Sequence, residues 1–92
     1  MEVQVHYAAQ LKAAAGEAVQ KISVPPGATV RDLLELLAEK HGPSMRALLF
    51  DDEGALRRSI LVFLGEEQLG RDLDRELKEG AEVTILSPVA GG

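Results

Sequence analysis

Residues 29–42 read TVRDLLELLAEKHG, the clearest structural signal in this 92-residue chain. Apolar residues recur at intervals of three and four, which is the spacing of one face of an α-helix: Val30, Leu33, Leu34, Leu37 and Ala38. Thr29 stands before the run and Asp32 follows three residues later, as in a capping box. A glycine and a proline at positions 42 and 43 end the pattern. We therefore predict an amphipathic helix over residues 29–41.

Strand patterns lie on both sides of this helix. Residues 2–7 alternate strictly and place their apolar members, Val3, Val5 and Tyr7, on one face. A second strand is predicted at about residues 18–24, where two prolines end it. The connection over residues 8–17 is predicted to form a helical turn at the tip of a long hairpin.

The second half of the chain predicts further strands and two short helical turns. Residues 59–64 form the most apolar strand, residues 65–70 form a turn into a short strand, and a last strand covers 82–86. The apolar residues between 45 and 50 predict a helical turn packed under the sheet. An acidic turn follows them at 51–54. The spacing of Leu69, Leu73 and Leu77 predicts another helical turn.

This order of elements predicts an α+β fold of the β-grasp type. A long first hairpin, one main helix and returning strands give a mixed sheet of four to five strands with the helix packed on one face. The first and last strands should lie side by side in the middle. We expect residues 1–86 to form this single domain and residues 87–92 to form a flexible C-terminal tail that ends in Gly-Gly.

Composition excludes several classes of function. The chain has 15 acidic and 10 basic residues, a net charge of −5, so it lacks the basic footprint of nucleic-acid binding and an anionic membrane surface is disfavoured. It has no cysteine, which excludes disulfides, thiolate metal sites and a thiol nucleophile. No signal peptide is visible and the longest apolar run is Ile60–Leu64, so we expect a cytoplasmic protein.

Signatures of an independent enzyme are sparse. His6 and His41 lie far apart in the sequence, and each is interpreted as structural or solvated. No serine has a nearby histidine or a glycine elbow, and no glycine-rich loop is suited to phosphate. The acids at 51–53 lack the alternating spacing of a calcium loop and are interpreted as a solvated turn. We expect no metal site.

The C-terminal residues carry more suggestive chemistry. Gly91 and Gly92 have no side chains, so with Val89 and Ala90 they can thread a narrow channel and leave the terminal carboxylate unhindered. That carboxylate becomes electrophilic only after conversion to an acyl-adenylate, and this chain has no nucleotide-binding loop, so a partner would bind the ATP. The alternatives are a frayed end or a remnant of cloning.

The sequence resembles the MoaD/ThiS family of ubiquitin-like sulfur carriers, which includes the small subunit of molybdopterin synthase. The resemblance covers nearly the whole chain and rests on four segments in order: VHYAAQLKAAAG at 5–16, VPPGATVRDLL at 24–34, LKEGAEVTI at 77–85 and PVAGG at 88–92. It implies a ubiquitin-like β-grasp fold.

The resemblance also implies a mechanism and partners. A ubiquitin-activating-like enzyme would adenylate the carboxylate of Gly92 with ATP and magnesium, and a sulfur donor would convert it to a thiocarboxylate. The acceptor would be the large subunit of molybdopterin synthase, our favoured pathway, or another sulfur-accepting enzyme of cysteine synthesis, thiamine synthesis or tRNA thiolation. Two alternatives remain: a ubiquitin-like modifier joined to lysines, and a binding module whose diglycine is inert.

The most apolar strand predicts a partner surface. Residues 60–64 cannot hide both faces under one helix, so Leu61 or Phe63, with Leu86 of the last strand, should form an exposed apolar patch. The alternative is that these side chains complete a thin core.

Overall fold

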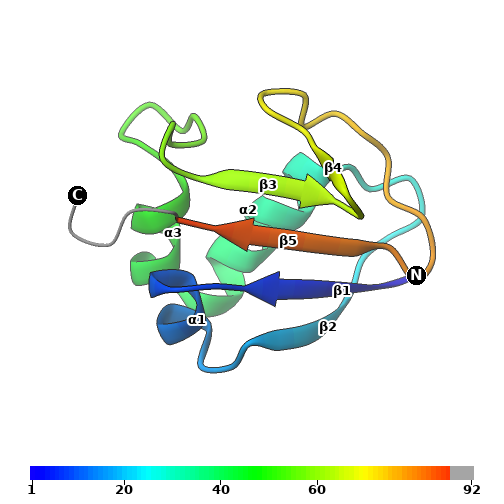
Figure 1. Ribbon diagram of the computed structural model, residues 1–92, viewed down its shortest axis with the longest axis horizontal. Helices are drawn as coiled ribbons and strands as arrows, with labels where there is room; N and C mark the ends of the chain where they lie inside the picture. Colours follow the sequence, from blue (N-terminus) through cyan, green and yellow to red (C-terminus); the bar gives the residue numbers. More distant parts are fainter. Residues whose placement is uncertain (88–92) are drawn as a thin grey trace.

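A computed structural model describes residues 1–87 as a five-stranded mixed sheet with helices packed against it (Figure 1). The elements in chain order are β1 (Glu2–Tyr7), α1 (Gln10–Ala15), β2 (Val19–Ser23), α2 (Val30–His41), α3 (Pro43–Leu49), β3 (Leu61–Leu64), β4 (Glu67–Gln68) and β5 (Glu82–Leu86). The order in the sheet is β2-β1-β5-β3-β4, and β1 and β5 run parallel while the other pairs are antiparallel. The first and last strands are therefore adjacent and central, which confirms the predicted β-grasp.

The main helix α2 begins with the predicted capping box. The backbone N–H of Asp32 donates to Thr29 Oγ1 over 3.2 Å, and the N–H of Thr29 donates to Asp32 Oδ2 over 3.0 Å. These bonds satisfy two donors that a helix N-terminus otherwise leaves unpaired. The five apolar residues of the predicted face are all buried.

Alternation along the strands separates a covered face from an open one. The apolar residues of β1 and β5 that point inward are 5% exposed or less: Val3, Val5, Tyr7, Val83 and Ile85. They meet α2, which lies behind the sheet in Figure 1. The near face of the sheet carries no helix among the described residues. This arrangement gives a single layer of core between the sheet and α2.

Helix α3 confirms the helical turn predicted after the proline. Gly42 has φ 89°, a left-handed conformation that suits glycine, and Pro43 occupies the first turn of α3, where its missing N–H costs nothing. The backbone of α3 neighbours α2 and α1. The acidic turn that follows is also confirmed: Asp51 Oδ1 accepts from the N–H groups of Glu53 and Ala55. These bonds hold the pKa of the Asp51 carboxyl below its ordinary value.

The helical turn predicted over Leu69, Leu73 and Leu77 is wrong. The segment consists of turns, although all three leucines are buried. Its backbone instead pairs with the start of α2: Val30 N–H donates to the carbonyl of Arg75, and Leu77 N–H donates to that of Ala28. These tertiary hydrogen bonds, in place of helical ones, fix the path of the segment, and burial of the leucines against the core sets their spacing.

Candidate functional site

Strand β5 is the last strand before the C-terminal residues. It is bonded on both sides, to β1 and to β3, and its inward side chains are fully buried. Ser87, placed in the tail by the sequence analysis, is also buried. Val89, Ala90, Gly91 and Gly92, the predicted reactive tail, lie outside the described residues. What the structure supplies is a rigid central strand that delivers the chain to one end of the sheet.

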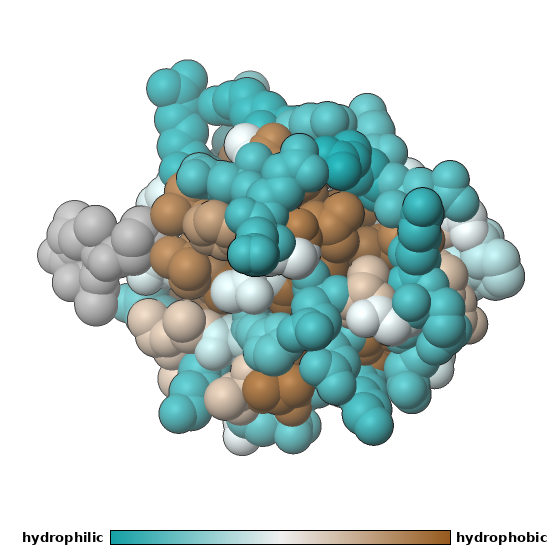
Figure 2. Space-filling model, turned by 45° about the vertical axis from the view of Figure 1, so that its right-hand side comes forward, coloured by the Kyte–Doolittle hydropathy of each residue, from teal (hydrophilic) through white to brown (hydrophobic). Residues whose placement is uncertain are grey.

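The three predicted patch residues lie close together on the open face. Leu61 and Leu86 are direct partners in the antiparallel register of β3 and β5, and Phe63 lies opposite Thr84 two residues further. Each of the three side chains is partly exposed. Figure 2 shows apolar surface between hydrophilic side chains on this side of the molecule. We call Leu61, Phe63 and Leu86 the sheet-face patch.

Beside the patch, on β1, the open face is polar, whereas Val19 of the outer strand β2 adds an exposed apolar side chain opposite His6. His6 Nε2 lies 3.1 Å from Glu82 Oε1, so β1 and β5 are bridged beside the patch. Both side chains are substantially exposed, and a pair of this kind contributes little to stability. The sheet-face patch therefore has a hydrophilic border on its β1 side, the common pattern of an apolar interface core with a polar rim.

His41 belongs to a hydrogen-bonded network between α2 and the first hairpin. Gln20 Oε1 accepts from the hydroxyl of Tyr7 over 2.8 Å and faces His41 Nε2 at 2.9 Å, so His41 carries its proton on Nε2. Burial, aided by the charge of Lys40, lowers the pKa of His41. Burial, aided by Glu17, raises the pKa of Tyr7. The network ties a helix end to the sheet and has a structural role.

Within residues 1–87 no group of three or more His, Asp or Glu side chains is placed to hold a metal ion. None of the helices in that range is long and apolar enough to cross a membrane.

An arginine-lined hollow of ≈ 330 Å³ beside β3 was not predicted from the sequence. Its charged residues are Arg31, Arg57, Arg58 and Arg71, which come from three separate segments. In the sequence only Arg57 and Arg58 stand side by side. Tertiary packing brings Arg31 and Arg71 to them.

The fold and the placement of β5 define a small ubiquitin-like protein of the β-grasp class. A family model described as the ThiS family matches residues 5–92, so the chain belongs to that family. The predicted likeness to the MoaD/ThiS ubiquitin-like sulfur carriers is thereby confirmed.

Solved structures from several organisms are similar to this chain. SAMP1 from Haloferax volcanii, a small archaeal modifier protein, is 29% identical with a TM-score of 0.88, and the match covers 100% of both chains. A chain of the BexX/CysO complex from Amycolatopsis orientalis is 29% identical with a TM-score of 0.73, covering 98% of this chain and 99% of the other.

A third structure is a putative molybdopterin converting factor, subunit 1, from Pyrococcus furiosus. It is 27% identical with a TM-score of 0.71, and the match covers 97% of this chain and 99% of the other. The comparison with curated proteins found no match. The relatives therefore agree on fold and family while differing in named function.

Proposed function

We propose that this protein is a sulfur carrier whose Gly92 carboxylate is adenylated by a ubiquitin-activating-like enzyme and then converted to a thiocarboxylate. The observation that carries the proposal is the family match over residues 5–92, which extends through Gly91 and Gly92. ATP and magnesium are bound by the partner enzyme, which does the phosphorus chemistry.

The reaction divides into an activation and a replacement. A carboxylate oxygen of Gly92 attacks the α-phosphorus of ATP, and pyrophosphate leaves. A sulfur donor at the oxidation level of sulfide then attacks the activated carbonyl, and AMP leaves with the original oxygen. The chain has no cysteine, so its own side chains offer no thiol to compete for the activated carbonyl.

The fold supports this chemistry by fixing the point at which the tail begins. Because β5 is bonded on both sides, the start of the tail is positioned as precisely as the sheet itself. The sheet-face patch begins at the same end, where Leu86 pairs with Leu61. An enzyme that receives the tail can therefore rest on the patch, whose apolar side chains are partly exposed.

The favoured sulfur acceptor is the large subunit of molybdopterin synthase. The likeness to the putative molybdopterin converting factor of Pyrococcus furiosus supports this choice. The likeness to a chain of the BexX/CysO complex supports another sulfur-accepting enzyme as the alternative. Incubation of the thiocarboxylated chain with each acceptor, followed by assay of sulfur in the small-molecule product, separates the two.

A second candidate is a modifier joined to lysines of other proteins. The likeness to SAMP1, a small archaeal modifier protein, favours it. Both functions use an activated Gly92, so they differ in the acceptor alone. Isopeptide-linked adducts in cells that express the tagged chain, absent when Gly92 is deleted, would show the modifier function. Their absence in cells that accumulate the thiocarboxylate would leave the carrier function alone.

A further inference from the structure

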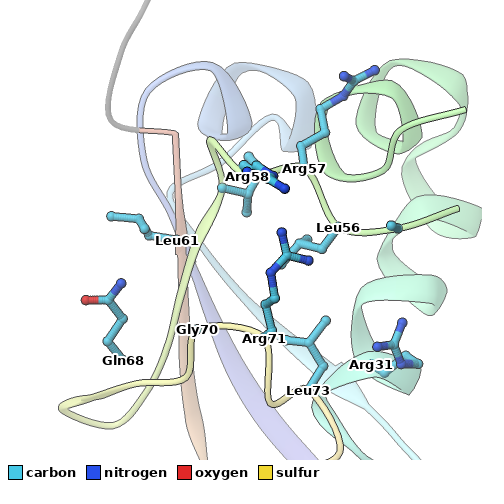
Figure 3. A pocket seen from close by; sticks show the side chains of 11 residues that line it. Arg31, Leu56, Arg57, Arg58, Leu61, Gln68, Gly70, Arg71 and Leu73 are labelled. Carbon is cyan, nitrogen blue, oxygen red and sulfur yellow. The ribbon is translucent and has the colours of Figure 1, made fainter. Parts of the chain in front are cut away.

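The arginine hollow concentrates positive charge on an acidic protein. Four of the ten basic residues line it, in a chain of net charge −5. In Figure 3 the guanidinium groups of Arg58 and Arg71 extend toward the same space from two sides of the hollow. Arg31 approaches from α2, and Arg57 points away. The arginines belong to three segments that are separate in the sequence, so the cationic site exists only in the folded protein.

Charge within the hollow is poorly compensated. Among residues 1–87 no carboxylate lies within 4.0 Å of Arg57, Arg58 or Arg71. The Arg31 Nε is 3.9 Å from Asp74 Oδ1, a long and exposed contact. The Arg57 Nε–H donates to the backbone carbonyl of Ala47 over 2.7 Å. Arg58 and Arg71 therefore have guanidinium groups free to bind an anionic ligand.

Arginines elsewhere in the described residues differ from this set. Arg75 forms two hydrogen bonds to the carboxylate of Glu67, of 2.7 and 2.9 Å, and Arg46 lies 3.6 Å from Glu35. Neither lines the hollow. Uncompensated arginine is thus a property of this site rather than of the surface as a whole.

The floor of the hollow is apolar. The buried residues Ile60 and Leu73 line it together with the partly exposed Leu56. A small inorganic anion gains nothing from such a floor, because it binds through hydrogen-bond donors. A nucleic acid is disfavoured by the net charge of the whole chain. A peptide segment with both carboxylates and an apolar side chain can bind the arginines and the apolar floor together.

The hollow also adjoins the sheet-face patch. Leu61 lines the hollow, yet its side chain points away from the hollow in Figure 3 and belongs to the open face. One protein partner that covers the patch can therefore extend a segment around the edge of the sheet. The two surfaces would be covered by a single continuous interface.

We propose that the arginine hollow docks an acidic segment of a partner protein, with carboxylates bound by Arg58 and Arg71 and an apolar side chain inserted against Leu56, Ile60 and Leu73. This docking needs neither Gly92 nor adenylation. It adds a second recognition element to the sheet-face patch.

The test is an NMR titration of the full isotope-labelled chain with three short peptides. The first places leucines among glutamates, the second replaces the leucines with serine, and the third replaces the glutamates with glutamine. We expect the first peptide to shift the amides of residues 55–61 and 68–73. The second and third peptides should bind about tenfold more weakly. Added salt should weaken binding of the first.

Matched variants assign the binding to the arginines. R58E/R71E should weaken binding of the first peptide by about tenfold or more. K12E/K21E makes the same change of net charge at exposed lysines outside the hollow, and it should weaken binding less than about twofold. R58Q/R71Q removes the two positive charges without adding negative ones, and it takes the place of R58E/R71E if that variant misfolds. Unchanged melting temperatures exclude misfolding of a variant.

Three results would overturn the proposal. The first is amide shifts centred away from the hollow. The second is an equal loss of affinity in the arginine and lysine variants. The third is binding of inorganic phosphate at the hollow while the leucine peptide binds no tighter than its serine counterpart, which would mark a small-anion site instead.

Discussion

At the scale of single residues, Thr29 has the most clearly defined energetic role. Its hydroxyl accepts the N–H of Asp32 and so caps α2. Thr29→Ala removes this acceptor, and we expect the free energy of unfolding to fall by about 1 kcal/mol. Thr29→Ser keeps the hydroxyl and serves as the control. Urea denaturation of the three proteins checks the prediction, and equal midpoints for the alanine variant and the wild type would contradict it.

His41 should make stability depend on pH. Its pKa in the folded protein lies below the ordinary 6.5, because burial and Lys40 oppose its charged form. The unfolded chain therefore takes up the proton first as the pH falls through about 6.5. We expect stability to decrease on this descent and to level off once the folded histidine is also protonated.

Comparison with His41→Gln isolates this effect. His6 is present in both proteins, so its contribution cancels. Denaturation midpoints measured between about pH 7.5 and 5 should converge or cross as the wild type loses stability relative to the variant. A wild type that gains stability relative to the variant over this range would show that the sign is wrong.

At the scale of elements, the segment 69–77 is part of the core although it has no helix. Leu73 is 2% exposed and packs in the same apolar cluster as α2. We expect Leu73→Ala to cost about 2–5 kcal/mol, the usual range for a leucine removed from a core. Val19→Ala, at a position on β2 that is 43% exposed, should cost less than about 1 kcal/mol. Similar losses in the two variants would show that this segment is not packed as described.

The sheet-face patch is the element at which partner binding should fail selectively. Phe63→Asp places a charge within the patch, and we expect affinity for the adenylating enzyme to fall at least about tenfold. Ser44→Asp adds the same charge at an exposed position in the first turn of α3, outside the sheet, and should leave binding unchanged. Calorimetric titration checks both. A folded Phe63→Asp or Leu61→Ser variant that still binds at full affinity would exclude the patch as the interface.

At the scale of the whole molecule, local patterns in the sequence predict most of the fold. The alternation in residues 2–7, the helical period of residues 30–38 and the cap at Thr29 are each contained in a short window. The strand order follows because one hairpin, one helix and the returning strands pack in few ways. The sheet-face patch was predictable for the same reason, since a strand alternates its side chains between two faces.

Features that depend on distant segments were not predictable. A spacing of four between leucines is typical of a helix, yet in residues 69–77 backbone bonds to the start of α2 decide the path. The arginine hollow joins residues near 31, 57 and 71, and no pattern within a window links them. Local windows thus predict elements and their faces, whereas sites built between elements need the tertiary structure.

The central claim concerns the carboxylate of Gly92, and intact-mass measurement tests it most directly. The full chain is incubated with its adenylating enzyme, ATP, magnesium and a sulfide source, beside a chain lacking Gly92. We expect the full chain to gain the mass difference between one sulfur and one oxygen, and the shortened chain to gain nothing. An unchanged mass of the full chain, with an enzyme active on its own substrate, would contradict the account.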